Sequence, residues 1–233
     1  MGQLDLAQSL TALIGENKVS TSQPDIKAHS IDKWLVSHPP DVVVFAESTE
    51  DVVRVMRFAH ENKVPVTTRG AGVGYVGGAV PIHGGIVLSV ARMNQIKEIN
   101  PEDGIAVAEP GVITGDLQER VKELGYFYPP DPASLKECSL GGNVATNAGG
   151  PRCLKYGVTR HYVLGLEVVL SDGSVVRLGG RCHKNKTGFD LIGMFVGSEG
   201  LLGIVTEITC RIIPNPPSRA MISCTFASFS EAA

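Results

Sequence analysis

Apolar residues recur at two different spacings along the first part of the chain. At helical spacing they predict helices over residues 3–14 and 48–62, and the second opens with Ser48-Thr-Glu-Asp51, a capping-box pattern. The continuous apolar run at 42–45 is typical of a short buried strand, and the β-branched run at 64–68 predicts the next strand. Together the second helix and the two runs predict a β-α-β unit with parallel strands and a right-handed crossover.

Beyond residue 95 short strands outnumber helices. The predicted elements are strands at 96–100, 105–109, 163–170, 175–178 and 204–213, and a helix at 114–124. Ser171-Asp-Gly-Ser174 is a strong two-residue hairpin signal, so we expect mostly antiparallel pairing here. The fold class is therefore α+β, with a small parallel α/β unit followed by a larger, mostly antiparallel α+β unit.

Composition narrows the classes of partner. The net charge of −3 and the 6% aromatic content argue against nucleic acid as the main partner. No apolar run approaches the length of a membrane span, and the N-terminus lacks the pattern of a signal peptide. The five cysteines form no C-x-x-C pair and favour free thiols in a reducing cytoplasm. The six histidines show no H-E-x-x-H or i,i+4 pair, so no metal site is expected.

The most informative segment is the glycine-rich run at 68–81. Its glycines are Gly70, Gly72, Gly74, Gly77 and Gly78. Such a run permits positive φ angles and lets backbone N–H groups approach a ligand closely. It contains a literal G-x-G-x-x-G, but in a Rossmann fold that motif opens a helix. Here Pro81, Gly84-Gly85 and the apolar run 86–90 follow, so we predict a loop and then a strand, with phosphate binding of another kind.

Two more glycine-rich clusters follow. The cluster at 138–150 combines glycines with hydroxyl and amide side chains that are suited to a planar, polar ring system. The cluster at 197–205 carries Glu199 as its only charge. Glycine runs are most often turns, and the ordered set of three is what favours a ligand site here.

The three clusters, taken in order, resemble the FAD-binding domain of the vanillyl-alcohol oxidase / p-cresol methylhydroxylase class. Within it the chain is most similar to the glycolate oxidase D subunit, D-lactate dehydrogenase and D-2-hydroxyglutarate dehydrogenase group. The resemblance covers roughly residues 40–215. The matching segments are 69–72 with 77–78, 130–134, 141–150, 155–157, 184–185 with 188–190, and 197–200.

The resemblance implies that FAD lies between two subdomains. The residues expected around the pyrophosphate are Arg69, Gly70, Ala71, Gly72, Val73, Gly74, Tyr75, Gly77 and Gly78. Those expected along the ribityl chain and the flavin are Pro130, Asp131, Ser134, Ser139, Gly142, Asn143, Thr146, Asn147 and Gly149. Backbone contacts to the adenine side or the ring are expected from Glu199, Gly200, Gly203, Ile204 and Val205.

Some positions depart from the family pattern or leave alternatives open. Val73 and Leu201 stand where the subgroup would have threonine, and each loses one hydroxyl donor. Val73 also stands where covalent members carry the flavin-linking histidine, so we expect non-covalent FAD. The alternative for Arg69 is a solvated surface position. For Glu199 a structural hydrogen bond with the backbone is as consistent as a cofactor contact.

The resemblance further implies that the chain is the FAD-binding part of a flavin-dependent D-2-hydroxy acid dehydrogenase or oxidase. Such an enzyme moves a hydride from C2 of the substrate to N5 of the flavin. A quinone, an iron–sulfur subunit or O₂ would then accept the electrons. The implied location is the cytoplasm, at the inner membrane if a partner subunit anchors the enzyme there. We name no catalytic base, because the family places much of the substrate pocket in a C-terminal domain.

The implied division of the chain has three parts. Residues 1–38 form an N-terminal helical segment, and 39–217 form the FAD-binding domain, with subdomains at about 39–95 and 96–217. A strand at 221–226 and a helix beginning at 228 would start a truncated substrate domain over 218–233, which suggests a fragment. The alternatives are a flavin-binding subunit whose substrate chemistry another chain supplies, and a non-redox nucleotide-binding scaffold. A reductase of the cell-wall UDP-sugar type shares the flavin fold.

Overall fold

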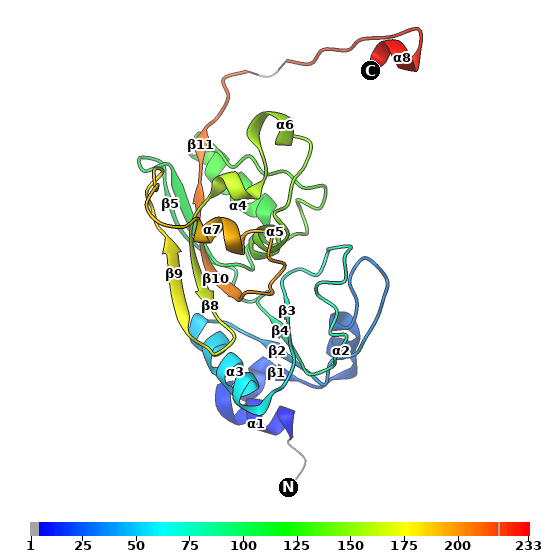
Figure 1. Cartoon of the computed structure of the whole chain (residues 1–233), viewed down its shortest axis with the longest axis vertical. Helices are drawn as coiled ribbons and strands as arrows, with labels where there is room; N and C mark the ends of the chain where they lie inside the picture. Colours follow the sequence, from blue (N-terminus) through cyan, green and yellow to red (C-terminus); the bar gives the residue numbers. More distant parts are fainter. Residues whose placement is uncertain (1–4, 219) are drawn as a thin grey trace.

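A computed structural model describes residues 5–218 and 220–233 and has two larger sheets, each the centre of one unit (Figure 1). The first sheet has the strand order β1-β2-β4-β3. Its strands are β1 (Val19–Ser20), β2 (Val42–Phe45), β3 (Val66–Arg69) and β4 (Ile86–Ser89). β2 and β3 both pair parallel with β4, while β1 pairs antiparallel with β2 at the edge. The expected β-α-β unit is therefore parallel, but β4 lies between its two strands.

Helices cover this sheet. They are α1 (Leu6–Ile14), η1 (Glu16–Lys18), α2 (Gln23–His29) and α3 (Thr49–Asn62). The Ser48 side chain caps α3 by accepting from the Asp51 N–H at 3.2 Å, as the capping-box pattern predicts. In a capping box the Asp51 carboxylate would accept from the N–H of the N-cap residue, Ser48. Here it accepts from the N–H of the preceding residue, Glu47, at 3.0 Å. Because β1 joins the sheet and α1 contacts α3, residues 5–38 pack as part of this unit.

The second unit is built on a five-stranded antiparallel sheet in the order β5-β6-β10-β8-β9. Its strands are β5 (Ile96–Asn100), β6 (Ile105–Ala108), β8 (Val163–Val169), β9 (Val175–Gly179) and β10 (Ile204–Arg211). A short ladder joins β7 (Tyr126–Phe127) to β11 (Ile213–Pro214). The helices are α4 (Thr114–Glu123), α5 (Leu140–Thr146), α6 (Cys153–Tyr156), η2 (Thr159–Tyr162) and α7 (Leu191–Phe195). A parallel unit followed by an antiparallel α+β unit confirms the predicted fold class.

The β8–β9 hairpin forms where the sequence predicts it, but with a longer loop. The Leu170 N–H donates to the Ser174 carbonyl at 2.8 Å, which leaves three residues at the tip instead of two. Gly173 provides the positive φ, +80°, that a three-residue loop needs. The strand predicted over 204–213 is also divided, because β10 ends at Arg211 and β11 begins at Ile213.

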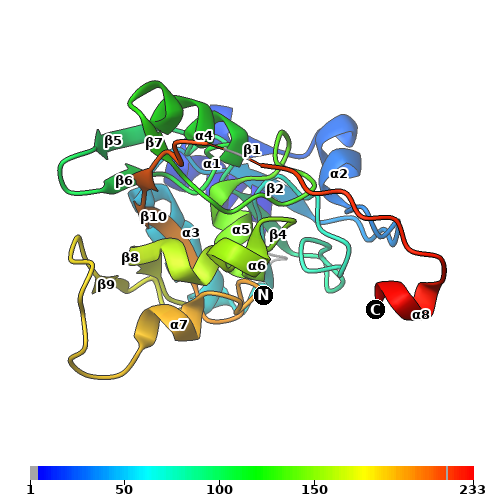
Figure 2. The ribbon, with the colours of Figure 1, turned by 90° about the horizontal axis from the view of Figure 1, so that it is seen from above.

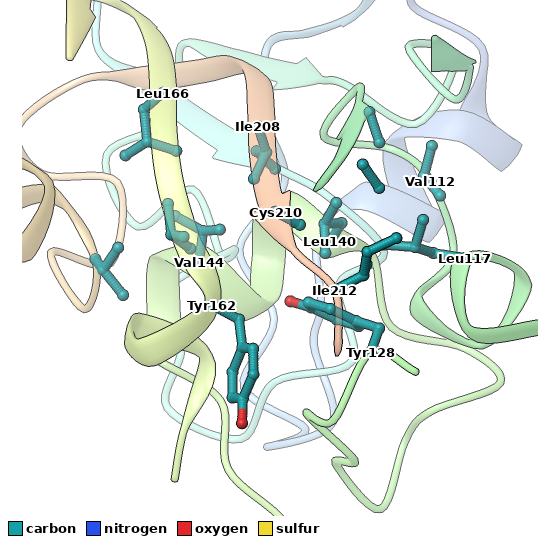
Figure 3. Packing of buried hydrophobic residues seen from close by; sticks show 14 of the residues in the cluster. Val112, Leu117, Tyr128, Leu140, Val144, Tyr162, Leu166, Ile208, Cys210 and Ile212 are labelled. Carbon is teal, nitrogen blue, oxygen red and sulfur yellow. The ribbon is translucent and has the colours of Figure 1, made fainter. Parts of the chain in front are cut away.

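Two hydrophobic cores lie on the two sheets. Figure 3 shows the core of the antiparallel unit, where Tyr128, Leu140, Ile208 and Cys210 pack beside one another. Burial raises the pKa of the Cys210 thiol to about 12, so this cysteine is an inert core residue at neutral pH. Val169 of β8 and Ile204 of β10 belong to the core of the parallel unit. The two units therefore share packed side chains next to the glycine clusters.

The strand predicted over 221–226 is absent. Residues 220–227 run extended and exposed, away from both sheets (Figures 1 and 2). Apolar alternation alone does not make a strand, because a strand needs a partner for its backbone hydrogen bonds. The helix predicted next forms as α8 (Phe229–Ala232). Among the described residues, no helix has the length and apolar character needed to cross a bilayer.

Candidate functional site

A cleft of about 440 Å³ lies where the three glycine clusters meet. Its volume is within the range of about 300–1,000 Å³ usual for ligand pockets. Both sheets contribute to its walls, through β3 of the parallel unit and β10 of the antiparallel unit. The predicted residues that line it are Gly70, Ala71, Gly72, Val73, Gly74, Gly77, Gly78, Ser134, Ser139, Gly142, Asn143, Thr146, Glu199, Gly200, Gly203, Ile204 and Val205.

The first wall is the glycine loop, residues 70–80, which follows β3 and leads to β4 as predicted. Gly72 has a φ of +67°, and a Cβ built there would lie 2.2 Å from the Arg69 guanidinium. Gly77 also has a positive φ, +77°. At Gly72 the left-handed backbone conformation favours glycine, and a Cβ would in addition displace the Arg69 guanidinium.

The loop presents backbone donors to the cleft. Among the residues that the structure describes, the N–H groups of Gly72, Val73 and Gly74 donate to no protein acceptor. Gly72 and Val73 are partly buried and Gly74 is exposed, so these three successive N–H groups are free to donate to solvent or to a bound ligand. Successive N–H groups of this kind bind anions such as phosphates.

The second wall contains α5, which the sequence analysis did not identify as a helix. Ser139 caps it by accepting from the Gly142 N–H at 3.3 Å, and also accepts from the Ala71 N–H at 3.2 Å. This hydroxyl therefore fastens the glycine loop to α5. The serine N-cap was the available signal, but the paired glycines in the first turn concealed the helix.

The polar side chains of α5 are engaged within the protein. Buried Asn143 donates through Nδ2 to the Thr114 hydroxyl at 2.6 Å, and Thr146 Oγ1 donates to the Gly142 carbonyl at 3.0 Å. The Asn143 amide and the Thr146 hydroxyl, which were expected to contact the ribityl chain and the flavin, therefore donate to groups within this wall instead.

The third wall is the turn before β10. Glu199 has a left-handed φ of +53°, and its N–H donates to the Ala145 carbonyl of α5 at 2.8 Å. Its exposed carboxylate has no hydrogen bond or ion pair to any other described residue. A Cβ on Gly203 would lie 2.7 Å from the Val168 side chain, so this glycine permits close packing of β10 on β8.

Arg69 does not line the cleft. Its side chain is buried behind the glycine loop, where it donates through Nη1 to the Ala79 carbonyl at 3.3 Å. Burial lowers the pKa of this guanidinium, and the nearby Asp32 carboxylate acts in the opposite direction. Arg69 thus supports the loop from behind, and the surface position considered as its alternative is wrong.

Five more predicted residues lie outside the cleft lining. Tyr75 is exposed to solvent, and the carbonyl of buried Pro130 accepts from Gln118 Nε2 at 2.6 Å. Asp131 forms an ion pair with Arg152 at 3.0 Å. Asn147 caps α5 in a left-handed conformation and accepts from the Arg160 N–H at 3.0 Å, while Gly149 packs against Cys153. In this structure these contacts shape the backbone around the cleft.

The cleft also includes residues that the sequence analysis missed. Asp32 lines it from a segment far outside the glycine clusters, and Val66–Thr68 line it from β3. No local pattern marks Asp32, since its contact with the loop joins residues 45 positions apart. Within residues 5–218 and 220–233, no group of His, Cys, Asp or Glu side chains could hold a metal ion.

Comparisons with known proteins agree with this geometry. A family model described as an FAD binding domain matches residues 40–179. The chain is 45% identical over 230 residues to the glycolate oxidase subunit GlcD of Bacillus subtilis (strain 168), over 98% of this chain and 49% of that relative. It is 47% identical over 179 residues to a D-lactate dehydrogenase of Anaerostipes hadrus, over 77% of this chain and 38% of the relative. The chain thus spans about half, or less, of the relatives' length.

A solved structure of p-cresol methylhydroxylase with substrate bound superposes with a TM-score of 0.78 at 29% identity, covering 91% of this chain and 43% of that one. The resemblance to this class, and within it to the glycolate oxidase and D-lactate dehydrogenase group, is confirmed. The family match includes the glycine loop and α5, which form two walls of the cleft. The chain therefore belongs to the family of FAD-binding domains, and its cofactor is FAD.

Proposed function

We propose that this chain is the FAD-binding part of a flavin-dependent D-2-hydroxy acid dehydrogenase or oxidase. The observation that carries the proposal is the meeting of three separate glycine clusters at one cleft, with free backbone N–H groups on its first wall. The substrate class rests on relatives that are named for glycolate and D-lactate.

The described residues fit a non-covalently bound FAD. In this proposal the N–H groups of Gly72, Val73 and Gly74 donate to the pyrophosphate, and Ser139 keeps α5 against that loop. Val73 provides no side-chain nucleophile for a covalent link at this position. Bound FAD would accept a hydride equivalent from C2 of the hydroxy acid, so the chain's own task is to bind and orient it.

The assignment of domains and partners is part of the same proposal. Residues 39–217 constitute the FAD-binding domain, and 218–233 begin a substrate domain that the longer relatives have room for. A quinone, an iron–sulfur subunit or O₂ takes the electrons. The protein works in the cytoplasm, with attachment to the inner membrane through a partner subunit where one is present.

The test is anaerobic reduction of the FAD-loaded chain. Glycolate, D-lactate and L-lactate are added separately, and the visible flavin absorbance is followed. Bleaching by glycolate or D-lactate, with L-lactate as the matched stereochemical control, supports the proposal. Equal bleaching by D- and L-lactate would rule out the D-2-hydroxy acid assignment.

Two other outcomes separate the alternatives. A chain that retains FAD but is reduced by none of the acids fits both the proposal, in which much of the substrate pocket lies in the C-terminal domain, and a flavin-binding subunit whose substrate chemistry lies on another chain. The two are separated by repeating the reduction with a protein that carries the complete C-terminal domain, which only the proposal predicts to be bleached. A chain that retains no FAD under any condition supports the non-redox nucleotide-binding scaffold.

A further inference from the structure

A short hairpin at residues 31–37 lies against the glycine loop. A bridge between Ile31 and Ser37 closes it. Leu35 at its tip is exposed and has a φ of +71°, which is costly for a bulky side chain. A strained backbone persists only where surrounding contacts hold it in place. The hairpin therefore has a fixed geometry that its own sequence does not favour.

Two hydrogen bonds join this hairpin to the glycine loop. The Asp32 carboxylate accepts from the Gly77 N–H at 2.8 Å, and the Lys33 N–H donates to the Gly74 carbonyl at 3.0 Å. Asp32 is only 7% exposed, and its second oxygen accepts from the Trp34 N–H at 2.8 Å. One buried carboxylate thus ties the hairpin to itself and to the loop.

The loop is consequently fixed from two sides. Arg69 contacts Gly72 and the Ala79 carbonyl from behind, while the hairpin holds the loop at Gly74 and Gly77. The free N–H groups of residues 72–74 lie between these attachment points. A rigid loop binds an anion more tightly than a mobile one, because less conformational entropy is lost on binding.

We propose that the 31–37 hairpin is a clasp for the glycine loop and that Asp32 is a positioning residue for the FAD pyrophosphate. The inference rests on the proposed role of this loop in holding FAD. Asp32 acts through the Gly77 N–H and not by touching the phosphates. Its negative charge is unfavourable next to the pyrophosphate but favourable next to the buried Arg69 guanidinium, so both the loop contact and its support from behind favour a carboxylate at this place.

The direction in which Asp32→Asn changes the Kd for FAD distinguishes a positioning role of Asp32 from a direct effect of its charge. Asparagine keeps one acceptor oxygen but places an NH₂ group where the second N–H donor needs an acceptor. If Asp32 positions the loop, the Kd for FAD rises on the order of tenfold, the value of one hydrogen bond to a charged group. If its charge alone matters, removal of the charge makes FAD bind more tightly.

Asp41→Asn is the matched control. The Asp41 carboxylate accepts from the Gly85 N–H at 2.7 Å, a contact of the same kind on a loop outside the cleft, although Asp41 is more exposed. Flavin fluorescence quenching gives the Kd, and thermal unfolding gives the loss of stability in each variant. Trp34, the only tryptophan of the chain, reports the position of the clasp by its fluorescence.

The proposal predicts that Asp32→Asn raises the Kd for FAD and changes the Trp34 emission, while Asp41→Asn leaves both unchanged. It is overturned if Asp32→Asn binds FAD as tightly as the wild type or more tightly. An equal rise in Kd in both variants also overturns it, because the effect would then be a general loss of stability. A wild-type chain that binds no FAD overturns this inference together with the proposed function, whereas binding by the wild type leaves the function standing.

Discussion

At the scale of single residues, glycine positions determine the shape of the cleft. Gly72 and Arg69 form an interlocked pair, in which the missing Cβ makes room for a buried guanidinium that supports the loop. Gly74, two residues on, has open space around it and no positive φ. Glycines that look equivalent in the sequence therefore have different structural roles, and substitution distinguishes them.

Gly72→Ala should lower the free energy of unfolding by about 1–2 kcal/mol or more, because a left-handed φ is costly for alanine and its Cβ would meet Arg69. Gly74→Ala is the matched control and should leave stability unchanged or raise it by up to about 1 kcal/mol. Urea unfolding of both variants measures the difference. Equal losses of stability would contradict the assigned role of Gly72.

At the scale of elements, one glutamate connects the two units. Glu167 on β8 is almost fully buried and accepts from Thr49 of α3 at 2.8 Å, from Thr206 of β10 at 3.0 Å and from Arg177 of β9 at 2.7 Å. Burial raises its pKa, but the hydrogen bonds from these three side chains outweigh burial and hold the pKa below its usual value. The carboxylate thus helps to fix α3 against the sheet that carries the third wall.

Glu167→Gln should lower the free energy of unfolding at neutral pH by about 1–3 kcal/mol. Because the folded-state pKa is depressed, the stabilisation is present above the unfolded pKa of about 4.5 and is lost as the pH falls through the folded pKa. The difference between variant and wild type should therefore shrink in acid. Glu207→Gln, which loses a half-exposed ion pair with Lys97, is the control and should cost less than about 1 kcal/mol. A pH-independent difference for Glu167→Gln would contradict the account.

The elements that could be predicted from the sequence are those whose pattern lies within their own residues. β2, α3 and α4 follow the apolar pattern of their own residues, with a Ser48 cap at α3, and they form where the sequence places them. The contact of Asp32 with Gly77 and the burial of Arg69 arise from tertiary packing, which no local pattern encodes. The strand predicted at 221–226 failed for the same reason, because pairing depends on a neighbouring strand.

At the scale of the whole molecule, two units with separate cores place three glycine clusters around one cleft. The sequence predicted these clusters as a set from their order along the chain, and the fold brings most of their residues together. The glycine loop supplies free donors, Ser139 and Glu199 hold the walls together through α5, and Arg69 supports the loop from behind. We propose on this basis that FAD binds at the junction between the units.

The most direct test of the central claim is an equilibrium titration of the chain with FAD, followed by gel filtration and denaturation. The account predicts one FAD per chain, displacement by ADP through the shared pyrophosphate, and full release of flavin from the denatured protein because the link is non-covalent. A chain that retains no flavin, or whose flavin stays attached after denaturation, would contradict it.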